Sequence, residues 1–305
     1  MNLTDKIVNL IRETSSSLPD DVLAALKSAQ RREAKGSSAA VVLKTILDNC
    51  AIAKRRGTPL CQDTGTLTFF VDERLRRKVT PEVIRRAVAV ATEKGYLRKN
   101  TIDSVTGRSF DDNVADGAPV VHYVGSEGVG LGSDGVGLGS DGVGLGSGRT
   151  GLKGIKRPYV TLIMKGGGSE NMSRQYSLPD AALGAGRDLA GVRKCVLDAV
   201  QKIQGYGCAP GILGVTIGGD RATGYEVAKE QLLRPLGEAA PSPLLKKLER
   251  RLLKEANSLG IGPMGLGGKT TLLGVKVAAR PRVPASFFVT VAYMCWACRR
   301  RSLQV

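Results

Sequence analysis

Histidine and aromatic side chains are scarce in this chain. Of 305 residues, one is histidine, and phenylalanine, tyrosine and tryptophan together make up 4%. The single histidine, His122, follows an apolar, strand-like stretch, and a structural role is its better interpretation. One histidine argues against a histidine-based metal site and against a Ser-His-Asp triad.

Long apolar runs and cysteine-dense stretches are also missing. No run is long enough to cross a bilayer, and residues 1–13 are amphipathic with mixed charge, unlike a signal peptide. We therefore expect a soluble, cytoplasmic protein without membrane contact. Six cysteines are too few for a disulfide scaffold, and in a reducing compartment they indicate core thiols, metal ligands or catalysis.

Acidic residues are outnumbered, with 28 Asp and Glu against 45 Lys and Arg, for a net charge of +17. Such a surface could bind nucleic acid, or it could attract small dianions and an acidic partner chain. Because aromatic residues are few and no RNA- or DNA-reading motif is present, nucleic-acid binding is the weaker interpretation.

Apolar periodicity predicts one mixed α/β domain over residues 1–305, with a mostly helical N-terminal part. Helical spacing predicts helices over 3–11, from residue 20, and over 39–53, 81–95, 192–203 and 241–258. Short apolar runs predict strands over 155–164, 212–217, 271–278 and 287–293. A glycine-dominated heptapeptide repeat at about 126–150 predicts a flexible loop.

Three short motifs match known patterns poorly. Gly130-Leu-Gly132-Ser-Asp-Gly135 fits a dinucleotide pattern, but the repeat generates it and the required strand and helix are missing. Gly268-Lys269-Thr270 lacks the first glycine of a phosphate loop, which would fall at Pro263, although Lys269 could still contact an anion. Cys295-Trp-Ala-Cys298 lacks a thioredoxin-like setting; its thiols could be buried, or one could be a cluster ligand.

The cysteines divide into two groups by context. Cys50 and Cys195 fall on apolar helical stripes and are predicted to be core residues. Cys61, Cys208 and Cys295 lie in predicted loops or after a strand, with glycine or proline near the first two, where backbone N–H groups can reach cluster sulfurs. Spacing alone leaves open whether these three hold a cluster or are scattered thiols.

Five segments, in this order, carry a resemblance to a known family. They are Cys61-Gln-Asp-Thr-Gly65, Lys165-Gly-Gly-Gly-Ser-Glu-Asn171, Gly207-Cys-Ala-Pro210 with Val215-Thr-Ile-Gly-Gly-Asp220, Leu259-Gly-Ile-Gly-Pro-Met-Gly-Leu-Gly-Gly-Lys269, and Met294-Cys-Trp-Ala-Cys298. Together they resemble the α part of class I, iron–sulfur dependent fumarate hydratases and L-tartrate dehydratases. The similarity covers most of the chain except the glycine repeat.

The resemblance implies a 4Fe–4S cluster with one iron free of protein ligands, and it assigns roles to individual residues. The implied ligands are Cys61, Cys208 and Cys295, and the implied substrate-binding residues are Gln62, Asp63, Arg98, Gly168 and Lys269. An open iron polarises a C–O bond, arginine pairs with carboxylate, and a glycine loop lets backbone amides approach an anion. Asp63 is the candidate for moving a proton to the departing hydroxyl; alternatively, it only caps the turn at Gly65.

The resemblance also implies a partner and a reaction. The chain stops soon after Cys295, as an α subunit would, so a β subunit is expected to complete the site in a hetero-oligomer. The implied function is reversible hydration of fumarate to L-malate, a tricarboxylic acid cycle step, by a hydro-lyase. The alternatives are an L-tartrate dehydratase α subunit, a basic nucleic-acid-binding protein and an iron–sulfur sensor. Val283 stands where relatives often have a histidine near the substrate.

Overall fold

The computed structural model describes residues 2–125 and 158–305, so the glycine repeat and the pattern at Gly130 lie outside the described residues. The helices are α1 Leu3–Ser16, α2 Asp20–Arg32, α3 Ser38–Arg56, α4 Pro81–Glu93, α5 Gly167–Asn171, α6 Leu189–Ile203, α7 Arg221–Gln231 and α8 Pro243–Ser258, with 3-10 turns η1 Glu73–Leu75 and η2 Pro263–Gly265. The strands are β1 Thr66–Asp72, β2 Thr101–Ile102, β3 Ser109–Phe110, β4 Val120–Val124, β5 Tyr159–Lys165, β6 Arg174–Ser177, β7 Gly211–Gly218, β8 Leu272–Arg280, β9 Phe288–Met294 and β10 Arg299–Gln304.

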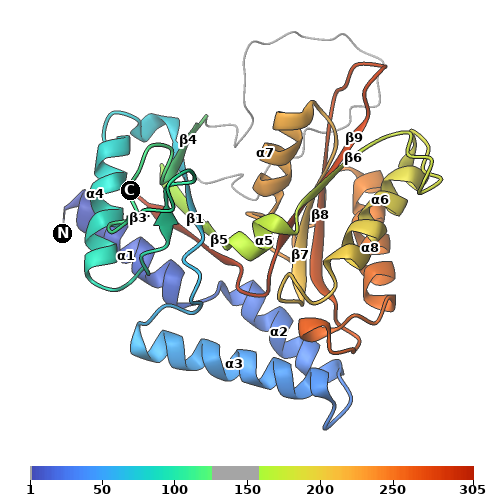
Figure 1. Ribbon diagram of the computed structural model, residues 1–305, viewed down its shortest axis with the longest axis horizontal. Coiled ribbons are helices and arrows are strands. Elements are labelled where there is room, and N and C mark those ends of the chain that lie inside the picture. The colour runs from blue at the N-terminus through green and yellow to red at the C-terminus, as the bar shows by residue number, and fades with distance from the viewer. Residues whose placement is uncertain (1, 126–157) are drawn as a thin grey trace.

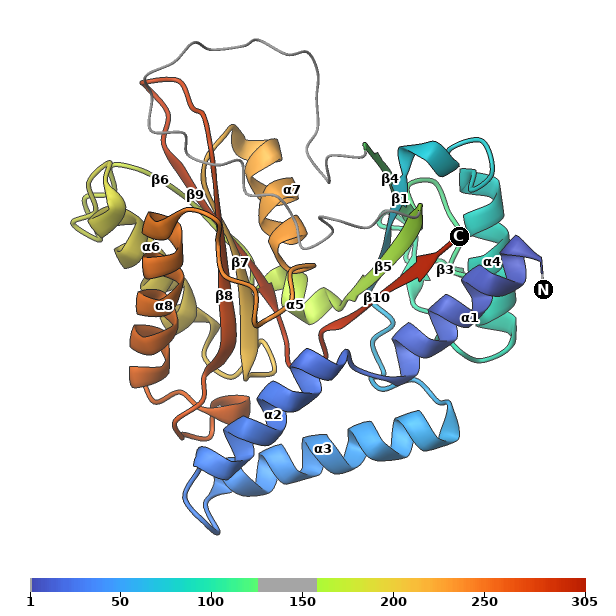
Figure 2. The ribbon, with the colours of Figure 1, turned by 180° about the vertical axis from the view of Figure 1, so that it is seen from behind.

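Two four-stranded mixed sheets stand side by side (Figure 1). The first has the order β10-β5-β1-β4, and the second has the order β6-β9-β7-β8. The chain returns from the second sheet to the first through the short connection between β9 and β10. Helices α2 and α3 run beneath both sheets, which the view from behind shows as well (Figure 2).

Three apolar clusters build the interior. The first sheet packs on α1 and α4, and the second packs on α6 and α8, because alternate strand residues point to one face. The third cluster joins the halves: Leu26 and Leu43 from α2 and α3 meet Phe70 of the first sheet and Ile212 of the second. This shared core fixes the two sheets relative to each other, and with them the loops between them.

Local signals explain where several helices begin and end. Thr80 caps α4 by accepting a hydrogen bond from Val83 N at 3.5 Å, with Pro81 in the first turn. Ser37 caps α3 in the same way, and Gly57 ends that helix with φ at 64°. The helices predicted from apolar spacing are found within a few residues of their expected bounds.

Several elements of the structure have no counterpart among the predicted ones: β1, β10, the short strands β2, β3 and β6, and the helices α5 and α7. The strand-like stretch at His122 is found as β4. β10 could not be predicted because it begins with three consecutive arginines from Arg299, an unusual composition for a strand. The predicted strand over 155–164 is found as Tyr159–Lys165. No described helix is long and apolar enough to span a membrane.

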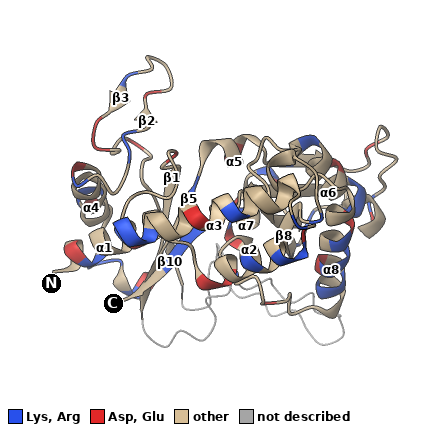
Figure 3. Ribbon diagram, turned by 90° about the horizontal axis from the view of Figure 1, so that it is seen from below, with Lys and Arg blue, Asp and Glu red and all other residues tan. Residues whose placement is uncertain are grey.

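Basic side chains gather on outer helix faces. Exposed lysine and arginine line α8 in the view from below (Figure 3): Lys246, Lys247, Arg250, Arg251 and Lys254.

The single histidine lies in β4, half-buried and stacked on Phe70 with ring centroids 5.3 Å apart, which agrees with its predicted structural role.

Candidate metal centre and active site

The three loop cysteines come from distant segments, and Cys61 and Cys295 both lie near enough to Cys208 to act on its thiol electrostatically. Cys61 precedes β1, Cys208 precedes β7, and Cys295 lies in the connection from β9 to β10. Burial raises the pKa of the Cys208 thiol, and the charges of Cys295, Cys61 and Asp63 raise it further. These groups are therefore electrostatic neighbours, although up to 234 positions of sequence separate them.

The backbone near Cys208 and Cys61 has two unusual features. Cys208 has φ at 53°, in the left-handed region that residues other than glycine rarely occupy, and its carbonyl accepts a hydrogen bond from Trp296 N at 3.3 Å. Asp63 N lies 3.4 Å from Cys61 Sγ and donates to it. Strain and N–H donors at thiols are features of sites where a ligand is held.

The remaining thiols are buried and chemically quiet. Cys50, Cys195 and Cys298 are at most 6% exposed. Desolvation raises their pKa values to about 11, 12 and 11, so they stay protonated at neutral pH. The prediction that Cys50 and Cys195 are core residues is confirmed, and within the CxxC motif only Cys298 is fully buried.

Asp63 holds two loops together. Its Oδ1 accepts hydrogen bonds from Gly65 N at 2.8 Å and from Asn100 Nδ2 at 3.1 Å. Its Oδ2 accepts from Gly167 N at 2.7 Å. The turn-capping contact expected from the sequence is present, but the carboxylate also reaches the glycine-rich segment after β5. Asp63 is thus fixed beside the cysteines by three donors.

Two glycines make that approach possible. A Cβ on Gly65, whose φ is 74°, would lie 2.5 Å from the carbonyl of Lys165. A Cβ on Gly166 would lie 2.8 Å from Asp63 Oδ2. At Gly65 the clash is with backbone and would force the loops apart, whereas at Gly166 a side chain would displace the Asp63 carboxylate from its position.

Arg98 is tied to the same loop through its backbone. Thr64 Oγ1 accepts a hydrogen bond from Arg98 N at 2.9 Å and donates to Arg98 O at 3.0 Å. Asn113 Nδ2 donates to the same carbonyl at 2.8 Å. The Arg98 side chain is exposed, which leaves its guanidinium available to a ligand beside this loop.

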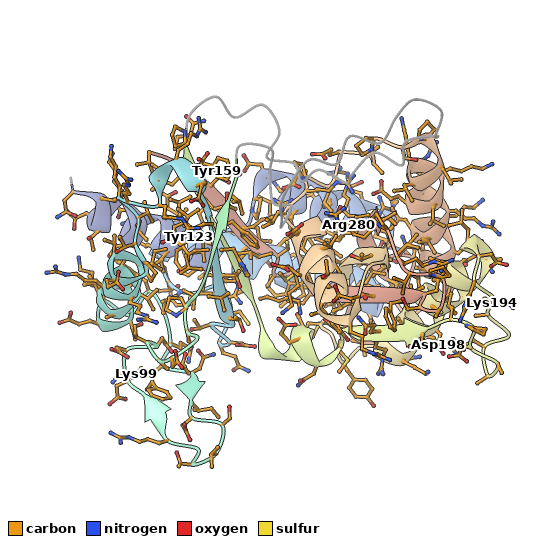
Figure 4. All side chains as sticks on the ribbon, turned by 90° about the horizontal axis from the view of Figure 1, so that it is seen from above. Lys99, Tyr123, Tyr159, Lys194, Asp198 and Arg280 are labelled. Atoms are coloured by element: carbon orange, nitrogen blue, oxygen red, sulfur yellow. The ribbon has the colours of Figure 1, made fainter. Side chains whose placement is uncertain are left out.

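A cavity of about 370 Å³ opens beside Asp63. Its walls include Gly167 and, from the segment after Arg98, Asn100 and Asn113. The β2–β3 hairpin projects from the body at this place, with Lys99 at its base, 3.4 Å from Asp111 (Figures 3 and 4). The space is ample for a four-carbon dicarboxylate.

One charged group near the cysteines escapes prediction from the sequence. The Lys165 ammonium is buried and lies 2.9 Å from Glu170, which also binds Lys229 at 2.6 Å. Desolvation lowers the pKa of Lys165 to about 8, against the opposing effect of Glu170. The segment resembles a substrate loop, and a lysine ending an apolar strand is the signal that could have marked the group.

Of the other predicted substrate residues, two lie near Asp63 and one lies in a different cavity. Gln62 is exposed beside Asp63, and Gly168 follows the Gly167 amide that binds Asp63. Lys269 lines a separate cavity, where its backbone N donates to Glu33 at 2.9 Å. Val283 is exposed in the β8–β9 connection, at the end of the sheet opposite Cys295. The roles of Gln62, Gly168 and Lys269 stay predictions.

The donor set fits an iron–sulfur cluster better than a single ion. Among the described residues, no three Cys, His, Asp or Glu side chains converge as ligands of one metal ion. A cluster has no such requirement, because each thiolate binds a different iron. Three neighbouring, partly accessible thiols, one of which already accepts an N–H, match that demand.

Comparison with known proteins shows the family. The sequence profile of the fumarate hydratase (fumerase) family matches residues 4–141 and 151–304. The chain belongs to the fumarate hydratase family. The matched residues include all three loop cysteines, Asp63 and Arg98.

Relatives in the fumarate hydratase family carry two kinds of name. A Geobacillus stearothermophilus protein assigned as a class I fumarate hydratase is 44% identical over 99% of this chain, and the match covers 55% of that protein. The chain therefore spans about half the length of this relative. A Methanocaldococcus jannaschii protein assigned as an L(+)-tartrate dehydratase α subunit is 31% identical, covering 98% of this chain and 96% of its own length. The Escherichia coli K12 L(+)-tartrate dehydratase α subunit is 30% identical, with 99% and 90% coverage.

Proposed function

We propose that this chain is the cluster-binding α subunit of a hydro-lyase that adds water to fumarate to form L-malate. The observation that carries the proposal is the electrostatic proximity of Cys61, Cys295 and the Asp63 carboxylate to Cys208. The 44% identity to a protein assigned as a class I fumarate hydratase supports fumarate over other diacids.

The three cysteines would hold a 4Fe–4S cluster. When bound, it supplies an iron without a protein ligand, a Lewis acid for hydroxyl and carboxylate oxygens. The protein's contribution is then to bind and orient the diacid. The Arg98 guanidinium pairs with one carboxylate, and the exposed Gly168 amide, next to the Gly167 amide that Asp63 occupies, approaches the anion closely.

Asp63 is the proton carrier in this proposal. Its three N–H donors fix the carboxylate in one orientation next to the cysteines. Hydration needs a proton removed from water and another added to the neighbouring carbon. Asp63 handles the first. The second falls to a group outside this chain, which is why the proposal includes a β subunit; relatives named as α subunits support a partner.

A second candidate is L-tartrate dehydration. Relatives matched over 90% or more of their own length are named L(+)-tartrate dehydratase α subunits, whereas the first relative extends well beyond the matched region. Both reactions interconvert a hydroxy-diacid and its dehydrated form through the same group types, so the choice depends on a few pocket contacts.

The test begins with anaerobic coexpression of the chain with its β subunit and measurement of iron and sulfide. We expect about four of each per α chain. Cys61→Ser, Cys208→Ser and Cys295→Ser should lower both, and the matched controls Cys50→Ser and Cys195→Ser should not. Initial rates on L-malate and L-tartrate then decide the substrate.

Each outcome has a clear meaning. Turnover of tartrate with none of malate would replace fumarate hydratase by the second candidate. A cluster without turnover would indicate an iron–sulfur sensor. Absence of iron from the wild-type chain, with DNA or RNA binding that weakens steeply as salt rises, would indicate a nucleic-acid-binding protein.

A further inference from the structure

Tyr293 carries a buried hydroxyl that has no partner among the described residues. The side chain is 1% exposed, and its Oη makes no hydrogen bond. Two partly buried tyrosines have hydrogen-bond partners: Tyr123 Oη donates to Val79 O at 2.9 Å, and Tyr176 Oη donates to Asp198 at 2.7 Å. A buried hydroxyl without a partner costs free energy, so the Tyr293 hydroxyl, one of a few such side-chain atoms among the described residues, requires an explanation.

The ring of Tyr293 occupies a slot made by the two glycines that flank Cys208. A Cβ on Gly207 would lie 2.3 Å from Cε1 of the ring. A Cβ on Gly211 would lie 2.4 Å from Oη itself. The backbone on either side of Cys208 is therefore open to the tyrosine, and phenylalanine would fill the same slot without burying a polar atom.

The hydroxyl also lies on the side of the thiols. Tyr293 is two residues before Cys295 at the end of β9, and its backbone N is held by Ser173 Oγ at 3.2 Å. In the sheet Tyr293 pairs with Leu213 of β7, the strand that Gly211 opens directly after the Cys208 loop, so its hydroxyl lies between that loop and the strand end that leads to Cys295. A negatively charged sulfur atom beside the unpaired Tyr293 hydroxyl would accept a hydrogen bond from it.

We propose that Tyr293 Oη donates a hydrogen bond to sulfur of the cluster held by Cys208 and Cys295. The proposal rests on the proposed function, because it requires the cluster. The hydroxyl would be a positioning and tuning group, not a catalytic one. A hydrogen bond to sulfur stabilises the more negative, reduced cluster and raises its reduction potential.

The test compares wild type, Tyr293→Phe and the control Tyr176→Phe after anaerobic reconstitution of the α–β complex. We expect Tyr293→Phe to bind the same amount of iron at a more negative reduction potential, followed by electron paramagnetic resonance. Melting temperatures add an independent reading. Without the cluster, Tyr293→Phe should melt at or above wild type; with it, below. Tyr176→Phe should leave the potential unchanged.

Three results would overturn the inference. An unchanged potential in Tyr293→Phe would show that the hydroxyl does not reach the cluster, while leaving the proposed function intact. A cluster-free Tyr293→Phe chain that fails to fold would show that the hydroxyl serves the protein alone. A wild-type chain that binds no iron would overturn the inference and the proposed function together.

Discussion

The Thr64 hydroxyl clamps the backbone of Arg98, accepting from its N–H and donating to its carbonyl, across 34 positions of sequence. Thr64 is 3% exposed, so both bonds are shielded from water. The arginine assigned to a substrate carboxylate is thus held in register with the residue after Asp63.

Thr64→Val keeps the shape of this side chain and removes both hydrogen bonds. We expect KM for the dicarboxylate to rise about tenfold, equivalent to about 1.4 kcal/mol, with iron content unchanged. Steady-state kinetics of the assembled enzyme measure this. Thr45→Val, which removes only a bond to Val41 O in α3, is the control and should leave KM unaltered.

Asp63→Asn separates the proton-moving role from the turn-capping role. If Asp63 moves a proton, kcat should fall by about 10²- to 10⁴-fold while iron content is kept. Asp103→Asn is the matched control, because Asp103 caps the β2–β3 turn by accepting from Val105 N and Thr106 N. Should Asp63→Asn lose stability but keep its turnover, Asp63 would be a structural cap only.

Glu230 on α7 predicts a pH-dependent stability. It is 1% exposed, and burial raises its pKa to about 8, although Arg280, in the half built on the second sheet (Figure 4), works in the opposite direction. The folded chain therefore holds a proton that the unfolded chain releases near pH 4.5, so stability falls as pH rises toward about 8. The expected loss is about 2–5 kcal/mol.

The Glu230→Gln variant removes this titration. Urea unfolding at pH 5 and pH 9 should show similar stability at the lower pH and a more stable variant at the higher one. Glu93→Gln, at the exposed end of α4, serves as the control. Equal pH profiles for wild type and Glu230→Gln would contradict the prediction.

Gly214 of β7 sets how closely α7 can pack. A Cβ there would lie 1.9 Å from Ala228 O, so Gly214→Ala must push the helix away from the sheet. We expect a loss of about 1–3 kcal/mol in the free energy of unfolding. Gly237→Ala, where a Cβ meets nothing within 4 Å, should cost far less in the same denaturation experiment.

Much of the fold could be predicted because local signals agree with it. Thr80 and Pro81 begin a helix that the structure contains, and the stripe through Val192 and Cys195 is a buried helix face. Strand pairing could not be predicted, since it depends on contacts between distant segments. β1 and β4 pair across more than fifty residues, and Arg299 enters a strand only because β5 offers it an edge.

For the site, sequence context alone separates the accessible thiols in loops from the buried thiols on helices. Sequence context cannot predict contacts that form only when distant segments come together in the fold. The Gly167 amide donates a hydrogen bond to Asp63, 104 positions earlier in the sequence. The pKa of Lys165 is lowered only because the folded sheet buries its ammonium. The motif around Lys269 assigns this residue to the substrate, yet Lys269 lines a cavity separate from that of Asp63.

The position of Cys295, between the last strand of one sheet and the edge strand of the other, has a consequence for the life of the protein. A cofactor bound there together with Cys61 and Cys208 would act as a covalent cross-link, closing chain loops as a disulfide does but in a reducing compartment. Oxidative loss of the cofactor would then remove this cross-link as well as stop turnover, and only the shared apolar core would hold the two halves. The damaged protein would become the form most readily cut by proteases, and inactivation and clearance would follow from one event.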